Sequence, residues 1–143
     1  MKTRTLTPFI AGIATLLVLS TAPALSADDN HPCSTHAVAG TWGFSLTGQL
    51  DGTPTLAAGQ FTLDRYGNVD GAGTFNVGGD VTDVPFSGTY TVNADCSGHM
   101  SLPDTPIEYD MVVLAGSNEI LFVSRDTSLV FAADAKRLPG SGD

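Results

Sequence analysis

Two carboxylates and two tyrosines are the side chains whose types and spacing could support acid–base chemistry. Glu108 and Asp110 lie two residues apart, and such a pair can act as acid and base when one carboxyl is buried. Apolar side chains alternate with them at Tyr109 and Met111, so we expect the two carboxylates on the solvated face of a strand. Tyr90 and Tyr109 lie on apolar faces and are the candidates for polar groups inside a cavity.

The histidines give no recognisable metal site. His31 and His36 share a segment with Asp28 and Asp29, residue types that bind metal ions, but their spacing matches no tight site. His99 stands apart on a short expected strand and should be exposed. We therefore expect no metal and no cofactor, and the catalytic residues, if there are any, stay unassigned.

The first 27 residues have the pattern of a secretory signal peptide. Lys2 and Arg4 precede an apolar stretch, Phe9–Leu19, and small residues follow up to Ala27. The apolar stretch is too short to cross a bilayer comfortably, so we expect cleavage near Ala27 and no membrane span afterwards. This predicts an extracytoplasmic protein, either periplasmic or secreted.

Charge narrows the range of partners. All fifteen acidic residues but only four of the six basic ones follow the predicted signal peptide, which leaves a net charge of −11. Such a surface repels nucleic acid and anionic lipid, so neither is an expected partner. The oligomeric state does not follow from the sequence.

Cys33 and Cys96 are the two cysteines of the chain. An even count in an exported domain predicts one disulfide, which would tie an N-terminal arm to the middle of the chain. A catalytic thiol or a metal thiolate is the alternative, and the lack of a C-x-x-C motif or of nearby paired histidines disfavours it.

Apolar residues recur at every second position after the signal peptide, which is typical of β-strands. Gly, Asn, Asp and Pro interrupt this pattern about every 8–12 residues, as in an all-β sandwich or barrel. We expect an arm over 28–39, a β-domain over 40–138 and a disordered tail over 139–143. The expected strands are Gly40–Leu50, Thr55–Asp64, Val69–Val77, Val84–Asn93, Gly98–Leu102, Ile107–Leu114, Glu119–Ser124 and Leu129–Arg137.

Short connections predict antiparallel pairing in sequence order, and eight such strands remove their edges best by closing. We therefore expect an eight-strand antiparallel up-and-down barrel, with an open β-sandwich as the alternative. Glycines on inward positions would either bend the barrel or leave space: Gly59, Gly71, Gly73 and Gly88. The expected interior side chains, and candidate ligand contacts, are Trp42, Phe44, Phe61, Phe75, Tyr90, Tyr109 and Phe122.

Two family resemblances are visible. Gly40-Thr41-Trp42 resembles the G-x-W motif of lipocalins, and Arg137 lies where that family often packs an arginine on the tryptophan. The segments Gly40–Phe44, Gly59–Val69 and Gly88–Gly98 resemble a group of small exported bacterial proteins of uncharacterised function. That group is similar to allene oxide cyclase-like barrels, so the resemblance implies a small barrel with an apolar interior.

These features favour an exported barrel that binds a small apolar molecule in its interior without catalysis. Two alternatives stay open. The resemblance to cyclase barrels, at the level of the fold alone, would allow a cyclase or isomerase that folds a polyene or polyketide-like substrate in the same cavity. A filled barrel would instead indicate a structural or surface-interaction protein.

Overall fold

The computed structural model describes residues 33–114, 116 and 118–140. The predicted signal peptide, residues 28–32 of the predicted arm with His31, and residues 141–143 of the predicted tail lie outside the described residues. Among the described residues, no helix is long and apolar enough to cross a membrane.

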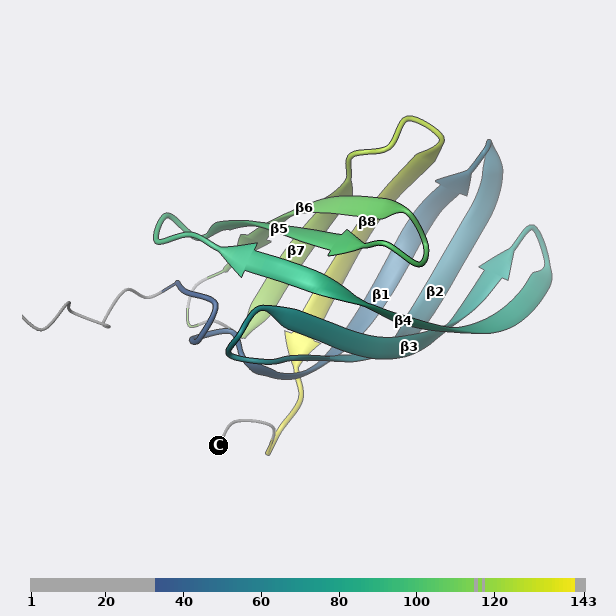
Figure 1. Ribbon diagram of the computed structural model, residues 1–143. Coiled ribbons are helices and arrows are strands. Elements are labelled where there is room, and N and C mark those ends of the chain that lie inside the picture. Colours follow the sequence, from purple (N-terminus) through teal and green to yellow (C-terminus); the bar gives the residue numbers. More distant parts are fainter. Residues whose placement is uncertain (1–32, 115, 117, 141–143) are drawn as a thin grey trace, which may run out of the picture.

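Eight antiparallel strands pair in sequence order and close into one barrel, because β1 also pairs with β8 (Figure 1). This confirms the predicted barrel and excludes the open sandwich. The strands are β1 (Gly40–Leu50), β2 (Thr53–Leu63), β3 (Asn68–Val77), β4 (Asp80–Val92), β5 (Ser97–Leu102), β6 (Ile107–Val113), β7 (Glu119–Ser124) and β8 (Leu129–Arg137).

Burial follows the alternation of the sequence. In β6, Tyr109, Met111 and Val113 are buried, whereas Glu108 and Asp110 face solvent. The same pattern recurs around the barrel, since successive side chains of a strand point to opposite faces. The apolar face of every strand is therefore inside.

The hairpin between β3 and β4 is longer than the sequence predicts, because β4 begins at Asp80 rather than at Val84. Gly78 and Gly79 have φ values of +60° and +106°, and they form a two-residue turn that lets Val77 pair with Asp80. Positive φ at both turn residues matches the twist of the flanking strands, so pairing continues to the end of the hairpin.

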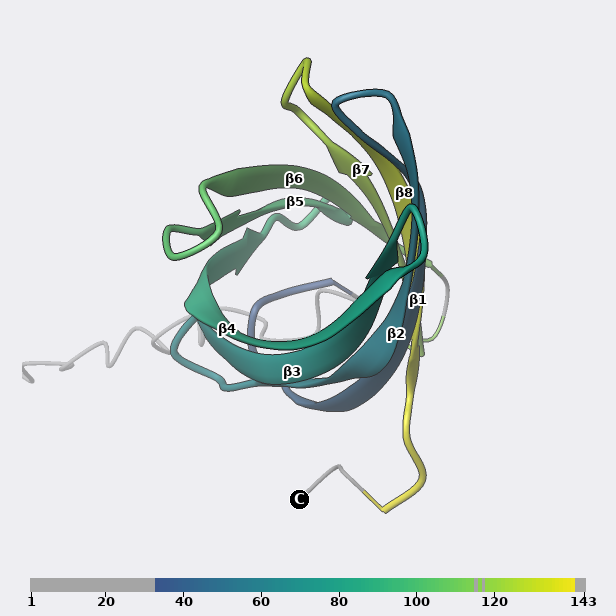
Figure 2. The ribbon, with the colours of Figure 1, turned by 90° about the vertical axis from the view of Figure 1, so that its right-hand side faces the viewer.

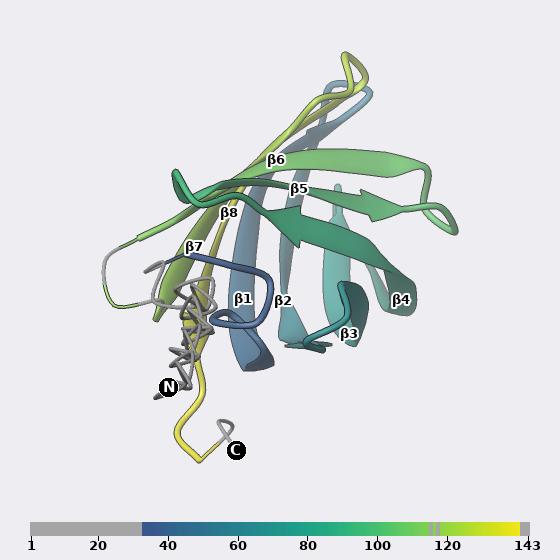
Figure 3. The ribbon, with the colours of Figure 1, turned by 60° about the vertical axis from the view of Figure 1, so that its left-hand side comes forward.

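The two ends of the barrel differ. Because the strands run up and down, the turns after β1, β3, β5 and β7 gather at one end, on the right in Figure 1; we call this the open end. Figure 2 looks into this end and shows the arm, residues 33–39, crossing the far side. Figure 3 brings the arm forward, and we call the end that it covers the closed end.

Trp42 is the centre of the closed end. Its ring is fully buried, and its Nε1 donates a hydrogen bond to the carbonyl oxygen of Val38 at 3.0 Å. The guanidinium of Arg137 lies 4.6 Å from the centre of the ring. The same guanidinium donates hydrogen bonds to the carbonyl oxygens of Ala39 and Ala37, at 2.6 and 2.9 Å. One tryptophan and one arginine thus hold the arm against the barrel.

The predicted disulfide joins Cys33 of the arm to Cys96 in the turn between β4 and β5, with the Cα atoms 5.0 Å apart. Cys96 has a φ of +69°, a conformation that few residues other than glycine adopt. Its carbonyl oxygen accepts a hydrogen bond from the Val113 amide, which ties the turn to the end of β6. A disulfide is compatible with an oxidising compartment.

Candidate ligand-binding cavity

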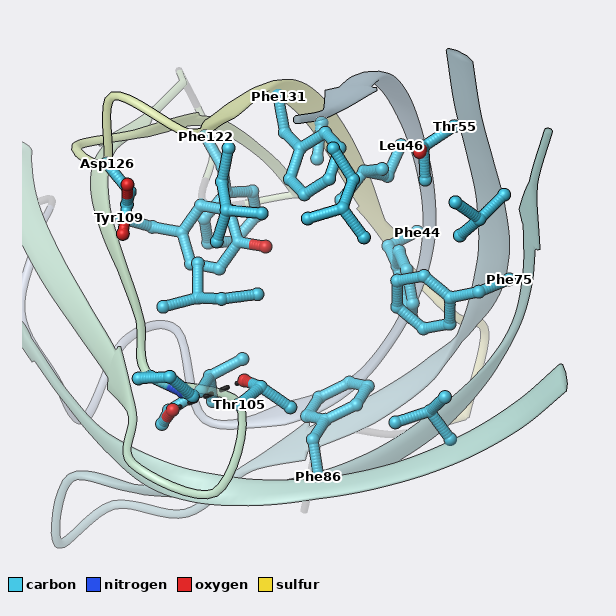
Figure 4. A pocket seen from close by; sticks show the side chains of 18 of the residues that line it. Phe44, Leu46, Thr55, Phe75, Phe86, Thr105, Tyr109, Phe122, Asp126 and Phe131 are labelled. Atoms are coloured by element: carbon cyan, nitrogen blue, oxygen red, sulfur yellow. Dashed lines mark hydrogen bonds between the residues drawn. The ribbon is translucent and has the colours of Figure 1, made fainter. Parts of the chain in front are cut away.

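A cavity of about 570 Å³ occupies the half of the barrel next to the open end. This volume lies within the roughly 300–1,000 Å³ that is typical of small-molecule sites. Figure 4 shows side chains from all around the barrel pointing into it. Most of its wall is apolar, and the largest contribution comes from six phenylalanines: Phe44, Phe61, Phe75, Phe86, Phe122 and Phe131.

Rings in contact form the part of this wall nearest the closed end. Phe44 contacts both Phe61 and Phe86 with ring centres 5.9 Å apart, and Phe122 contacts both Phe61 and Tyr109 at 6.1 Å. Tilted and edge-to-face pairs of this kind stabilise one another beyond the burial of their area. These contacts join the rings into one continuous aromatic wall.

Five of the seven predicted interior residues line the cavity: Phe44, Phe61, Phe75, Tyr109 and Phe122. Trp42 and Tyr90 point inward as well, but they lie at the closed end and do not border it. The Tyr90 hydroxyl lies 2.5 Å from the Asp64 carbonyl oxygen and 2.9 Å from that of Thr35, and it donates to them. Trp42 and Tyr90 therefore hold the arm in place, and they are too far from the cavity to contact a ligand in it.

Tyr109 is a polar side chain in the aromatic part of the cavity wall. Its side chain is 7% exposed, and Figure 4 shows its hydroxyl pointing into the open space. Across residues 33–114, 116 and 118–140 the hydroxyl finds no hydrogen-bond partner. Burial raises the pKa of Tyr109 to about 12, so the group is a neutral phenol that can donate to a bound molecule.

The inward glycines do not create this cavity. A Cβ atom added at Gly73 would lie 2.8 Å from the Phe44 ring, and one at Gly71 would lie 2.6 Å from Cβ of Phe61. At Gly88 it would lie 2.0 Å from a backbone oxygen of the neighbouring strand. The space that the missing side chains leave is filled by these rings and by backbone, which favours the bending role over the cavity role.

The acidic pair proposed for acid–base chemistry lies on the outer wall, as the alternation predicts. Glu108 contacts Nε2 of His99 and accepts a hydrogen bond from Ser101 at 2.7 Å, and these bonds lower the pKa of Glu108. Asp110 lies 3.4 Å from Nε of Arg125. The pair is thus part of a solvated cross-strand network, away from the cavity.

Comparison with protein-family models, with curated proteins and with solved structures finds no significant match to this chain.

The sequence did not single out the residues at the rim of the cavity, among them Asp80, Thr105 and Asp126. They lie in turns or next to them, where the alternation of apolar and polar residues does not predict which way a side chain points. The strand order does contain this information, because alternate turns of a meander lie at the same end of a barrel. The turns after β1, β3, β5 and β7 could therefore have been predicted to lie together at one end.

The two tyrosines provide a matched test of these assignments. We expect Tyr90→Phe to lower the free energy of unfolding by about 1–2 kcal/mol, because it removes the hydroxyl that donates to the carbonyl oxygens of Thr35 and Asp64. Tyr109→Phe should change it by less than about 0.5 kcal/mol, because the hydroxyl has no partner among the described residues. Urea unfolding of both variants measures the two changes in the free energy of unfolding. Equal losses would contradict the assignment of one bonded hydroxyl and one unbonded hydroxyl.

Proposed function

We propose that this protein is a non-catalytic, extracytoplasmic binding protein that holds one small, largely apolar molecule in the open half of its barrel. The observation that carries the proposal is the cavity of about 570 Å³, with an aromatic wall and the largely buried Tyr109, whose hydroxyl has no partner among the described residues. An apolar wall with few polar groups is the usual composition of a small-molecule site. The Tyr109 phenol would orient the ligand by donating to one of its oxygen or nitrogen atoms.

The proposal includes an extracytoplasmic location and a relationship to lipocalins. The signal-peptide pattern of the sequence and the Cys33–Cys96 disulfide both support an extracytoplasmic location. The stacking of Arg137 on Trp42 supports the resemblance to lipocalins, since this is the contact that the resemblance implies. A barrel closed at one end by such a contact suits a protein that receives a ligand through the other.

Titration with the neutral fluorescent lipophile N-phenyl-1-naphthylamine tests the proposal. We expect saturable binding, and loss of at least about tenfold in affinity in Ala133→Trp, because the indole would occupy the cavity that Ala133 lines. The matched control is Ala132→Trp, the adjacent and exposed residue of β8, which should bind as the unaltered protein does.

A second variant guards against misfolding, because overpacking of an interior costs stability. Thr82→Trp places the same bulk at the exposed rim of the cavity, where the strand can accommodate it. Binding that survives in both Ala133→Trp and Thr82→Trp would reject the cavity as the site.

A further inference from the structure

The open end of the barrel carries an aspartate at each of its four turns. They are Asp51 between β1 and β2, Asp80 at the start of β4, Asp104 between β5 and β6, and Asp126 between β7 and β8. Asp80 and Asp126 also line the cavity itself, and Figure 4 shows Asp126 near Tyr109 at its edge. The four turns thus carry a ring of aspartates, of which Asp80 and Asp126 border the path of a molecule into the barrel.

Cations do not offset this ring. Among the described basic residues, Arg65, Lys136 and Arg137 lie toward the closed end. Arg125 follows β7 at the open end, but its Nε lies 3.4 Å from Asp110 on the outer wall. The rim thus has a net negative charge, and a chain with fifteen acidic and six basic residues adds to that field.

Hydrogen bonds favour the charged form of the Asp126 carboxylate at this rim. Asp126 accepts hydrogen bonds from the amide and the hydroxyl of Ser128, at 2.9 and 2.8 Å, and these bonds lower the pKa of Asp126. Both bonds go to the same carboxylate oxygen, Oδ1. Asp126 itself is exposed, so its charge is presented at the entrance of the cavity.

This acidic end opens onto the cavity, which contains a polar side chain without a partner. The Tyr109 side chain is largely buried, and its hydroxyl points into the cavity and makes no hydrogen bond in the described part of the chain. It carries no positive charge, and no lysine, arginine or histidine of the described residues lines the cavity, so no charge inside would offset that of a carboxylate on a ligand. An anionic head group would thus meet repulsion at the rim and no cation within.

We propose that the ligand is a cationic amphiphile, whose apolar body fills the aromatic cavity while a protonated amine stays at the aspartate rim. This inference rests on the proposed binding function and adds the charge of the ligand to it. Fatty-acid-like anions are the class that it excludes. Electrostatic attraction at the entrance would also speed the approach of such a ligand at low salt.

The test uses three probes with the same ten-carbon tail: decylammonium, decanol and decanoate. Each is titrated against the protein loaded with N-phenyl-1-naphthylamine at neutral pH, below the concentration at which it forms micelles. At low salt we expect decylammonium to bind at least about tenfold more tightly than decanoate, with decanol between them. The ratio of decylammonium to decanoate affinity should fall at about 1 M salt, where exposed charges are screened within about 3 Å.

Two double variants locate the source of the preference. Asp80→Asn with Asp126→Asn should reduce the ratio of decylammonium to decanoate affinity by at least about threefold. Asp70→Asn with Asp134→Asn removes the same charge from the outer wall, and it should leave the ratio unchanged. Ala133→Trp should lose all three probes, which separates cavity binding from adsorption on an acidic surface.

The outcomes distinguish the two proposals. If decanol binds but decanoate equals or exceeds decylammonium, the cationic inference is overturned and the binding function stands. The inference is also overturned if the preference is the same in both double variants. If neither the dye nor any of the three probes binds, both proposals fail together.

Discussion

Replacement of Cys33 and Cys96 by alanine together should lower the free energy of unfolding by about 4 kcal/mol. The disulfide spans a sequence separation of 63 residues, and the loss of that constraint on the unfolded chain has this size in the chain-entropy model. Urea unfolding of the double variant measures the loss. Both cysteines are replaced together so that no free thiol remains to react.

The unaltered protein under reducing conditions is the control for the disulfide, since it should show a similar loss with every side chain retained. Binding of N-phenyl-1-naphthylamine to the folded fraction should change little, because the disulfide lies at the closed end and the cavity near the open one. A loss below about 1 kcal/mol would contradict the contribution of the disulfide to stability.

Trp42→Ala should have an effect of similar size, about 4 kcal/mol of unfolding free energy. The ring is fully buried, and its removal leaves a void and deprives Arg137 of its aromatic partner. The Val38 carbonyl oxygen loses its indole donor as well. Thermal and urea unfolding measure the loss.

The matched control for Trp42 is Tyr66→Ala, which removes another aromatic ring. Tyr66 is 81% exposed in the turn after β2, so the change in unfolding free energy should stay within about 0.5 kcal/mol. Similar losses in the two variants would mean that Trp42 does not hold the closed end. Together these variants test a division of the barrel, in which the closed end supplies stability and the open end keeps a cavity.

Most of the fold follows from the sequence, because alternation and turn residues are local properties. The bounds of β1, β7 and β8 agree with the prediction, and the alternation in β6 correctly placed Glu108 and Asp110 outside. The start of β4 differs from the prediction, because the expected strands leave residues 78–83 as a connection. In the structure Gly78 and Gly79 are the whole turn, and pairing begins at Asp80.

The site was predictable only in part, because alternation gives the face of a residue and not its height along the barrel. Trp42 and Tyr90 share the inward face with Phe44 and Tyr109, and only the register of the strands places them at the closed end. The glycines were equally ambiguous, since the ring of Phe44 fills the space beside Gly73 only in the folded barrel. The position of a side chain along the barrel axis, and the atoms that fill the space beside a glycine, depend on tertiary packing.

The most direct test of the binding proposal is a methyl NMR titration of the protein with decanol. We expect chemical-shift changes at methyl groups that line the cavity, those of Leu46, Ile107 and Leu129. The chemical shifts of the buried methyl groups at the closed end, those of Val38 and Leu63, should not change. Changes confined to the exposed methyl groups of the outer wall, Val112, Leu121 and Val123, or no changes at all, would contradict ligand binding inside the barrel.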